Sequence, residues 1–243
     1  MILPNPKDAL HKAMLYRLLI ALLDSKDVAP YLYFKGGTCA AMLGWLDRFS
    51  IDLDFDLQPK TDELQLTISL KRVFDTCGFT VTQEAKKELY FILKYQASPG
   101  GRSTLKLSII DQPQPANVYR PQYLSEIGRY AMCQTIETMF ANKLVAVTDR
   151  FQKYHTIAGR DIYDIHHFFI QGYGFDQNVI SERTGESPKV YLRRLITFIE
   201  QKVTQKIMNE DLSYLLTPAQ FQAVQRTILT EVLVFLRDAY TKT

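Results

Sequence analysis

Apolar and polar residues alternate without a break from residue 51 to residue 57. This period of two predicts a strand that buries one face and exposes the other. The apolar positions are Ile51, Leu53, Phe55 and Leu57, and the polar positions are Asp52, Asp54 and Asp56. Neighbouring carboxylates on such a face are about 6.6–7 Å apart. The pattern therefore predicts a row of three carboxylates that needs a positive partner.

A second short strand is predicted upstream, at residues 31–34, and a glycine pair ends it. Gly36 and Gly37 allow a sharp turn and leave the backbone N–H groups uncovered. A short apolar helix is then predicted at residues 40–45. Thr38 suits either the N-cap of this helix or a phosphate contact through its hydroxyl, and the two roles are compatible.

Strand, glycine turn, short helix and acidic strand together suggest a site for a metal and phosphates. Two neighbouring carboxylates can bracket a hard divalent cation, and Mg²⁺ usually takes one or two carboxylates plus substrate phosphates. The N–H groups of the glycine turn would bind those phosphates. Asp52 and Asp54 are the predicted metal ligands. Arg48 could neutralise a phosphate or pair with the local carboxylates, and Ser50 lies beside it.

The remaining periodicity divides the chain into a mixed half and a helical half. Residues 112–119, with two prolines, read as a linker, so the predicted domains are 1–112 and 113–243. No element is predicted for residues 123–134. The fold class is α+β, a mixed sheet with flanking helices followed by a helical domain. The other predicted helices are 6–23, 62–77, 135–150, one from 159, 176–183, 187–206 and 219–240, and the other strands are 79–85, 89–97 and 103–111.

Composition is that of an ordinary globular protein. The 243 residues are 47% hydrophobic and 23% charged, with a net charge of +3 that does not by itself indicate a nucleic-acid partner. No apolar run approaches the roughly 20 residues that span a bilayer, and no signal peptide is recognised. Three scattered cysteines form neither a metal motif nor a disulfide framework. We therefore expect a cytoplasmic protein that does not enter a membrane.

These motifs resemble a known family. The run from Lys35 to Ala40 (Lys-Gly-Gly-Thr-Cys-Ala), followed by the run from Arg48 to Phe55 (Arg-Phe-Ser-Ile-Asp-Leu-Asp-Phe), looks like the first motif of the AbiEii/AbiGii toxins. That family belongs to the DNA polymerase β-type nucleotidyltransferase superfamily. The resemblance implies a nucleotidyltransferase fold for the N-terminal domain. It also implies a toxin that transfers a nucleotide from an NTP.

Later segments resemble further motifs of the same family. A predicted helix carrying Lys143, a short loop and then Arg160-Asp161-Ile-Tyr-Asp164 match them. The resemblance implies that Lys143 and Asp164 are functional residues, with Asp161 and Arg160 as neighbours. On the residues alone, Asp161 and Asp164 lie on one helical face, where they could simply cap and solubilise the first turn.

One family motif is incomplete. A third carboxylate usually stands on a strand beside the Asp-x-Asp strand, in a pattern that aligns with residues 105–109, but this chain has Ser108 there. Asp111 could be brought round, Asp56 could substitute, or the chemistry could run on two acids. Lys106 in the same motif is either a site residue or a solvated strand lysine.

The expected activity is Mg²⁺-dependent transfer from an NTP to an acceptor hydroxyl. The resemblance suggests RNA, such as the tRNA 3′ end, as acceptor and a cognate antitoxin as partner. The alternatives are a small-molecule acceptor and a non-catalytic nucleotide-binding or interaction module, which only Ser108 favours. The expected catalytic residues are Asp52, Asp54, Lys143 and Asp164, and the expected nucleotide- and phosphate-binding residues are Gly36, Gly37, Thr38, Arg48, Ser50, Lys106 and Asp161.

Overall fold

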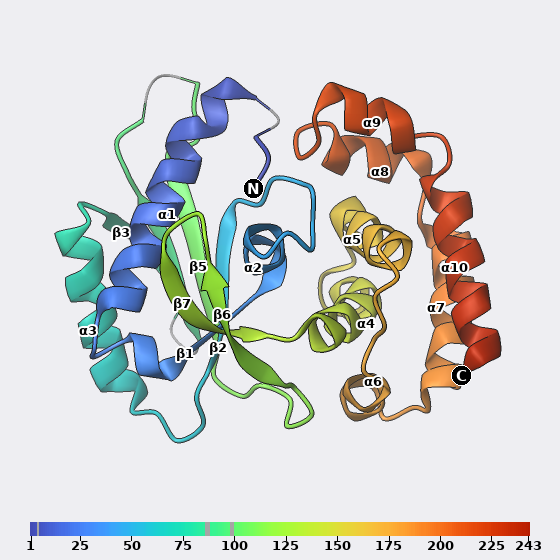
Figure 1. Ribbon diagram of the computed structural model, residues 1–243, viewed down its shortest axis with the longest axis horizontal. Helices are drawn as coiled ribbons and strands as arrows, with labels where there is room; N and C mark the ends of the chain where they lie inside the picture. The colour runs from blue at the N-terminus through green and yellow to red at the C-terminus, as the bar shows by residue number, and fades with distance from the viewer. Residues whose placement is uncertain (4, 86–87, 98–99) are drawn as a thin grey trace. The chain divides into compact units, whose positions relative to one another are not determined.

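The structure is a computed structural model that describes residues 1–3, 5–85, 88–97 and 100–243 (Figure 1). It divides into two compact units. The first comprises Met1–Pro113 and Tyr119–Gln134, and the second Gln114–Val118 and Thr135–Thr243. A mixed sheet in the first unit and helices in the second confirm the α+β class.

The first unit is built on a seven-stranded sheet in the order β3-β4-β5-β2-β1-β7-β6. The acidic strand β2 is central: it pairs antiparallel with β1 and parallel with β5. The outer strands pair β5–β4, β4–β3 and β7–β6 antiparallel, and β1–β7 parallel. The strands are β1 (Leu32–Lys35), β2 (Asp52–Leu57), β3 (Thr80–Glu84), β4 (Leu89–Lys94), β5 (Thr104–Ile110), β6 (Tyr119–Leu124) and β7 (Arg129–Gln134).

Burial of the apolar face of β2 fixes the orientation of the acids. Leu53 and Phe55 are fully buried, and Phe55 packs against Phe34 of β1 with ring centroids 5.0 Å apart. Helix α1 (Ala9–Asp24), preceded by the 3₁₀ turn Pro6–Asp8, contacts β2 and β7, while α3 (Glu63–Thr76) contacts β3 and β4. A one-residue slip of β2 would bury the aspartates instead, so packing of the apolar row sets which face they occupy.

The short helix after β1 begins earlier than predicted. Helix α2 runs from Gly36 to Met42, so the glycine pair forms its first turn instead of a turn before it. Gly36 has φ +79°, a left-handed conformation that favours glycine. The backbone therefore passes directly from strand to helix at this residue.

Residues 119–134 form two strands that the sequence analysis did not assign. Strands β6 and β7 form a hairpin, and β7 attaches it to β1. The first unit therefore extends beyond the predicted boundary at residue 112. Pro121, which argues against a central strand, is accommodated because β6 lies at the edge of the sheet. In the predicted hairpin of β3 and β4, residues 86–87 of the connection lie outside the described residues.

The second unit is helical. Two predicted helices are each divided in two: residues 187–206 into α7 and α8, and residues 219–240 into α9 and α10. At the first break Val203 is extended and the Thr204 side chain caps the next helix. Periodicity alone did not reveal this break because Val203 stays buried. The helices are α4 (Ile136–Tyr154), α5 (Gly159–Ile170), α6 (Gln177–Thr184), α7 (Pro188–Lys202), α8 (Gln205–Leu212), α9 (Pro218–Val224) and α10 (Ile228–Lys242).

Candidate functional site

The register of the sheet fixes the neighbours of the three aspartates. Asp54 stands opposite Lys35 of β1 and Ser108 of β5. Asp52 stands opposite Lys106 of β5. Paired residues share a face of the sheet, so the acids lie among polar side chains from both neighbouring strands. The predicted acidic row is therefore formed.

Asp56 differs from the other two acids because its carboxylate is enclosed by donors. It is 1% exposed and pairs with the Lys35 ammonium. The Tyr119 hydroxyl donates to its Oδ2 at 2.6 Å, and the Gln134 amide donates to the same atom at 2.7 Å. This carboxylate ties β2 to β1, β6 and β7, which does not fit its use as a third metal ligand.

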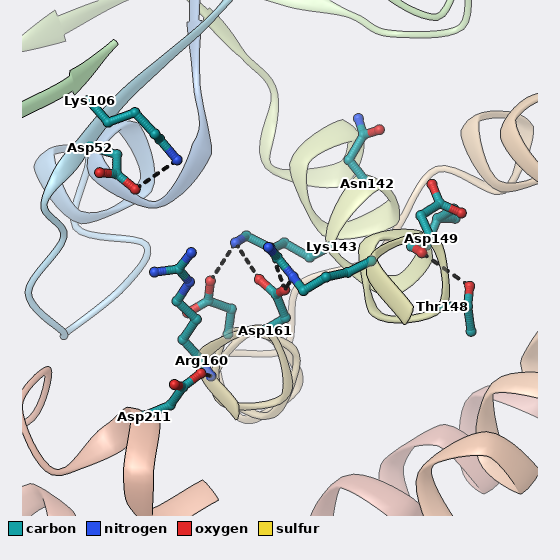
Figure 2. Close-up of polar contacts among 12 residues, drawn as sticks. Asp52, Lys106, Asn142, Lys143, Thr148, Asp149, Arg160, Asp161 and Asp211 are labelled. Carbon is teal, nitrogen blue, oxygen red and sulfur yellow. Dashed lines mark hydrogen bonds and ion pairs between the residues drawn. The ribbon is translucent and has the colours of Figure 1, made fainter. Parts of the chain in front are cut away.

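Asp52 is paired with a lysine from the neighbouring strand. Lys106 Nζ lies 3.0 Å from Asp52 Oδ2, and both side chains remain partly exposed (Figure 2). An ammonium group thus supplies positive charge at the Asp52 end of the acidic row. Lys106 is a neighbour of the carboxylates and not a solvated lysine remote from them.

The glycine pair is packed directly against the acidic strand. A Cβ added to Gly36 would lie 2.7 Å from Asp54 Oδ2. A Cβ on Gly37 would lie 2.9 Å from Arg48 Nη2 and 3.0 Å from Ser50 Oγ. Only residues without a side chain allow the backbone to approach the carboxylate and the guanidinium this closely.

We expect Gly36→Ala to disrupt the site more than its conformation alone predicts. Gly44, at φ +76°, has open space where its Cβ would be, so Gly44→Ala measures the cost of the left-handed backbone alone. That cost is about 1–2 kcal/mol. Gly36→Ala adds a clash with Asp54 and should cost about 1–3 kcal/mol more. Urea unfolding followed by fluorescence of Trp45, the single tryptophan, compares the two; equal losses would contradict the close-packing argument.

The polar residues beside the glycines are buried supports. The Thr38 hydroxyl donates to the Asp52 carbonyl at 2.5 Å and lies 2.9 Å from Ser50 Oγ. Arg48 Nη1 donates to the Phe49 carbonyl at 2.9 Å. Thr38 therefore connects α2 to the first residue of the acidic strand, and it is not the N-cap of that helix, a position that Lys35 occupies.

The third-acid position holds no carboxylate. Ser108 stands beside Asp54, and Tyr90 of β4 stands on its other side. Asp111 follows the last residue of β5, beyond the paired part of the strand. Over the described part of the chain, no group of three or more His, Cys, Asp or Glu side chains is placed to hold a metal. The donor set around the glycines thus consists of Asp52 and Asp54.

The second unit brings together the other predicted residues. Lys143 of α4 lies 3.1 Å from Asp161 Oδ1 of α5 (Figure 2). It also lies 2.8 Å from Oδ2 of Asp164 on the same helix. Arg150 Nη2 lies 3.0 Å from Asp161 Oδ2. Asp161 is 1% exposed and Asp164 is 0% exposed, so solvation of the first turn does not explain them. They join α5 to α4 through buried charges.

Asp161 should make stability depend on pH. Burial opposes its ionisation, but Lys143, Arg150 and Arg160 lower its pKa from 3.8 to about 2. A lowered folded-state pKa stabilises the fold above pH 3.8, and this contribution is lost as the pH falls through about 2. The shift corresponds to about 2 kcal/mol.

Comparison of the wild type with Asp161→Asn measures this contribution. We expect the stability difference, followed by helical circular dichroism in urea, to be full at neutral pH and to shrink in the acid range. Asp238→Asn is the control, because Asp238 forms an exposed i,i+4 pair with Lys242. Such pairs contribute about 0.3–0.5 kcal/mol. A pH-independent difference for Asp161→Asn would contradict the assignment.

Sequence reasoning missed the groups that hold Asp56. Lys35 was visible as part of the motif, but Tyr119 and Gln134 come from a linker and an unassigned segment. The structure brings the glycines, Thr38, Arg48, Ser50, Asp52, Asp54 and Lys106 together in one unit, and Lys143, Asp161 and Asp164 in the other. That both groups act on one ligand stays a prediction.

Residues 17–233 match the family model described as nucleotidyl transferase AbiEii toxin, type IV TA system. No curated protein matches the chain. None of the helices in the described ranges has the length and hydrophobicity needed to cross a membrane.

Three solved structures are similar in fold. An H. pylori protein described as a nucleotidyltransferase has a TM-score of 0.61 at 19% identity, covering 98% of this chain and 96% of its own. JHP933 from Helicobacter pylori has a TM-score of 0.59 at 19% identity, with 98% and 94% covered. MenT4, a nucleotidyltransferase toxin from Mycobacterium tuberculosis, has a TM-score of 0.57 at 19% identity, with 97% and 87% covered.

Proposed function

The chain belongs to the AbiEii nucleotidyltransferase toxin family, and from this we propose that Asp52 and Asp54 form its nucleotide-transfer site. The family description places the toxin in a type IV toxin–antitoxin system, which implies an antitoxin counterpart and an NTP substrate. The observation that carries the proposal is the approach of Gly36 to the Asp54 carboxylate. That approach brings the backbone of the first turn of α2 directly beside the acidic strand, so that phosphates bound by its N–H groups would lie near the acids.

The donor set fits Mg²⁺. Asp52 and Asp54 share one face of β2, and Mg²⁺ is commonly bound by one or two carboxylates together with substrate phosphates. When bound, Mg²⁺ would neutralise phosphate charge and orient the triphosphate. Asp52 and Asp54 would be its protein ligands. The ion pair of Lys106 with Asp52 supports this assignment, because a positive group already lies 3.0 Å from that carboxylate.

The remaining residues would position the substrates. Gly36 and Gly37 would present backbone N–H groups to the phosphates, and Lys106 could reach a phosphate oxygen from its place beside Asp52. Thr38 holds the start of β2 through the Asp52 carbonyl. The acceptor hydroxyl would give its proton to water and attack the α-phosphorus, forming a new P–O bond as the bond to pyrophosphate breaks. Positioning and electrostatics supply most of the catalysis in phosphoryl transfer.

Lys143 and Asp164 remain expected functional residues on the strength of the family motif. Their mutual pairing at 2.8 Å supports the view that Asp164 orients the Lys143 ammonium. A lysine oriented in this way is suited to a phosphate group. We propose that RNA, such as a tRNA 3′ end, is the acceptor.

A labelled-transfer assay tests the function. Purified protein is incubated with Mg²⁺, each labelled NTP in turn and total RNA that includes tRNA. We expect label on RNA with Mg²⁺, no label with a chelator, and no label with Asp52→Asn. Equal labelling by the wild type and Asp52→Asn would contradict the proposal.

A non-catalytic nucleotide-binding module is the second candidate. Ser108 favours it, because the usual third carboxylate is missing beside Asp54. Isothermal titration distinguishes the two. Nucleotide binding without transfer to any acceptor would favour the module over the enzyme.

A further inference from the structure

The face of the sheet that carries the acids continues into exposed aromatic side chains. Tyr33 of β1 stands opposite Asp56, and its ring lies 4.4 Å from the ring of Tyr119 on β6. Further along the β6–β7 hairpin, Tyr123 stands opposite Tyr130 on the same face, with ring centroids 5.1 Å apart. The register places all four tyrosines on the side of the sheet that carries the aspartates.

The outer pair is unusually exposed for such large side chains. Tyr130 is 71% exposed and Tyr123 is 53% exposed. Met132 lies between this pair and the pair of Tyr33 and Tyr119. It is 38% exposed and stands opposite Pro121. We call Tyr123, Tyr130 and Met132 the tyrosine face. The two rings contact each other across the strands, and more than half of each tyrosine is exposed.

We propose that the tyrosine face is a stacking platform for the unpaired bases of a single-stranded RNA acceptor. Aromatic rings on a sheet bind single strands in this way because every base has a flat π-surface, so stacking does not depend on sequence. The inference rests on the proposed transfer to an acceptor hydroxyl. It adds the surface and the structural class of the acceptor: an unpaired strand rather than a duplex.

The distance to the acids suits this role. Cys133 of β7 pairs with Phe34 of β1, so the next residue, Gln134, lies beside Lys35. Lys35 stands opposite Asp54 of β2. Tyr130 lies four residues before Gln134 on β7. Four residues along the strand and two strand spacings across the sheet give roughly 16 Å between Asp54 and Tyr130. An acceptor end at Asp54 and bases at the tyrosine face would therefore belong to one short segment of RNA.

A protein partner fits this surface less well. The tyrosine face contains three side chains, whereas a specific protein interface takes about 20–30 residues from each partner. It is also continuous with the proposed site of transfer, which an acceptor must reach. The surface thus matches a few stacked bases better than a folded protein.

The test measures RNA binding without chemistry. Full-length protein is titrated, with a chelator and without NTP, into a fluorescein-labelled unstructured RNA of about 12 nucleotides, within the range of single-strand sites. The double variant Tyr123→Ala/Tyr130→Ala should bind at least about tenfold more weakly, since one stacked base contributes about 5- to 150-fold. Tyr123→Phe/Tyr130→Phe keeps the rings and should retain affinity. Unchanged binding by the alanine variant would overturn the proposal.

A matched control separates stacking from general loss of tyrosine. Tyr154 and Tyr214 are exposed on the second unit at 59% and 49%. Tyr154→Ala/Tyr214→Ala should bind the same RNA as the wild type does. Equal weakening by this control, or tighter binding of a duplex than of the single strand, would count against a specific platform. A loss of self-association in the ring variants with unchanged RNA affinity would show an interface between copies and also overturn it.

Transfer kinetics then connect the platform to the reaction. In the alanine variant we expect KM for the RNA acceptor to rise by at least about tenfold, while KM for the NTP and kcat stay near wild type. Asp54→Asn should do the reverse, removing transfer but keeping RNA affinity. If the wild type binds RNA through its rings but transfers nothing, the platform stands and the proposed function fails. If transfer occurs with no effect of the rings, the platform alone fails.

Discussion

Asp54→Asn is expected to reduce nucleotide transfer by at least about a hundred- to a thousandfold, the usual loss when a group that stabilises transition-state charge is removed. Asparagine keeps the shape but carries no charge to hold a cation. The Gly36 backbone beside it stays unobstructed, because the side chain does not grow. The measurement is initial rate of label transfer at saturating NTP and RNA.

Controls for this experiment come from the same unit. Asp24 is an exposed carboxylate on α1 that pairs with Arg129 at 2.6 Å, and Asp24→Asn should leave transfer unchanged. Asp111→Asn tests whether the residue beyond β5 acts as the third acid, and we expect near wild-type rates. Near wild-type transfer by Asp54→Asn, with Trp45 fluorescence showing an intact fold, would remove the acid pair from the mechanism.

Asp56→Ala is expected to be the most destabilising single substitution among the three aspartates. It removes the partner of Lys35 and the acceptor for Tyr119 and Gln134, in a place that is 1% exposed. Removing one member of a buried ion pair costs about 3–5 kcal/mol. Urea unfolding monitored through Trp45 reports on the first unit, which contains all four groups.

A double-mutant cycle identifies the cause of that loss. Lys35→Met should cost less than Asp56→Ala, because Asp56 keeps the Tyr119 and Gln134 donors. The combined variant should cost less than the two single losses added together, since neither charge is then left alone. The exposed pair is the reference: Asp24→Ala should cost about 0–1 kcal/mol. A loss that small for Asp56→Ala would show that the network does not stabilise the sheet.

The alternating run at residues 51–57 was sufficient to predict the acidic strand and its orientation. The apolar side chains lie on one face of the strand and that face packs against the core, so the aspartates lie on the opposite face. The glycine pair was predicted for the same region, but its place inside α2 was not. Nothing in the composition of residues 36–42 separates a turn before a helix from the first turn of one.

Strands β6 and β7, in residues 119–134, could not be predicted from the local sequence pattern. Their alternation places tyrosines and Met132 on an exposed face, so a hydrophobic pattern gives no clear signal. The sequence pattern also did not distinguish Asp56 from Asp52 and Asp54. All three occupy equivalent positions in the alternation, and the donors that distinguish Asp56 come from β1 and from the unassigned segment.

The divided first unit has a consequence for how the chain is synthesised. Its sheet is complete only with β6 and β7, and in the sequence these strands follow Gln114–Val118, a segment that belongs to the second unit. When only the first 113 residues have been synthesised, β1 is an unpaired edge of the sheet. Asp56 then lacks two of its three donors, Tyr119 and Gln134. Completion must wait until Gln134 emerges. In a nascent chain that pauses before that point, the unpaired edge of β1 could pair with a strand of another chain. A fragment that ends at residue 112 would always have this unpaired edge.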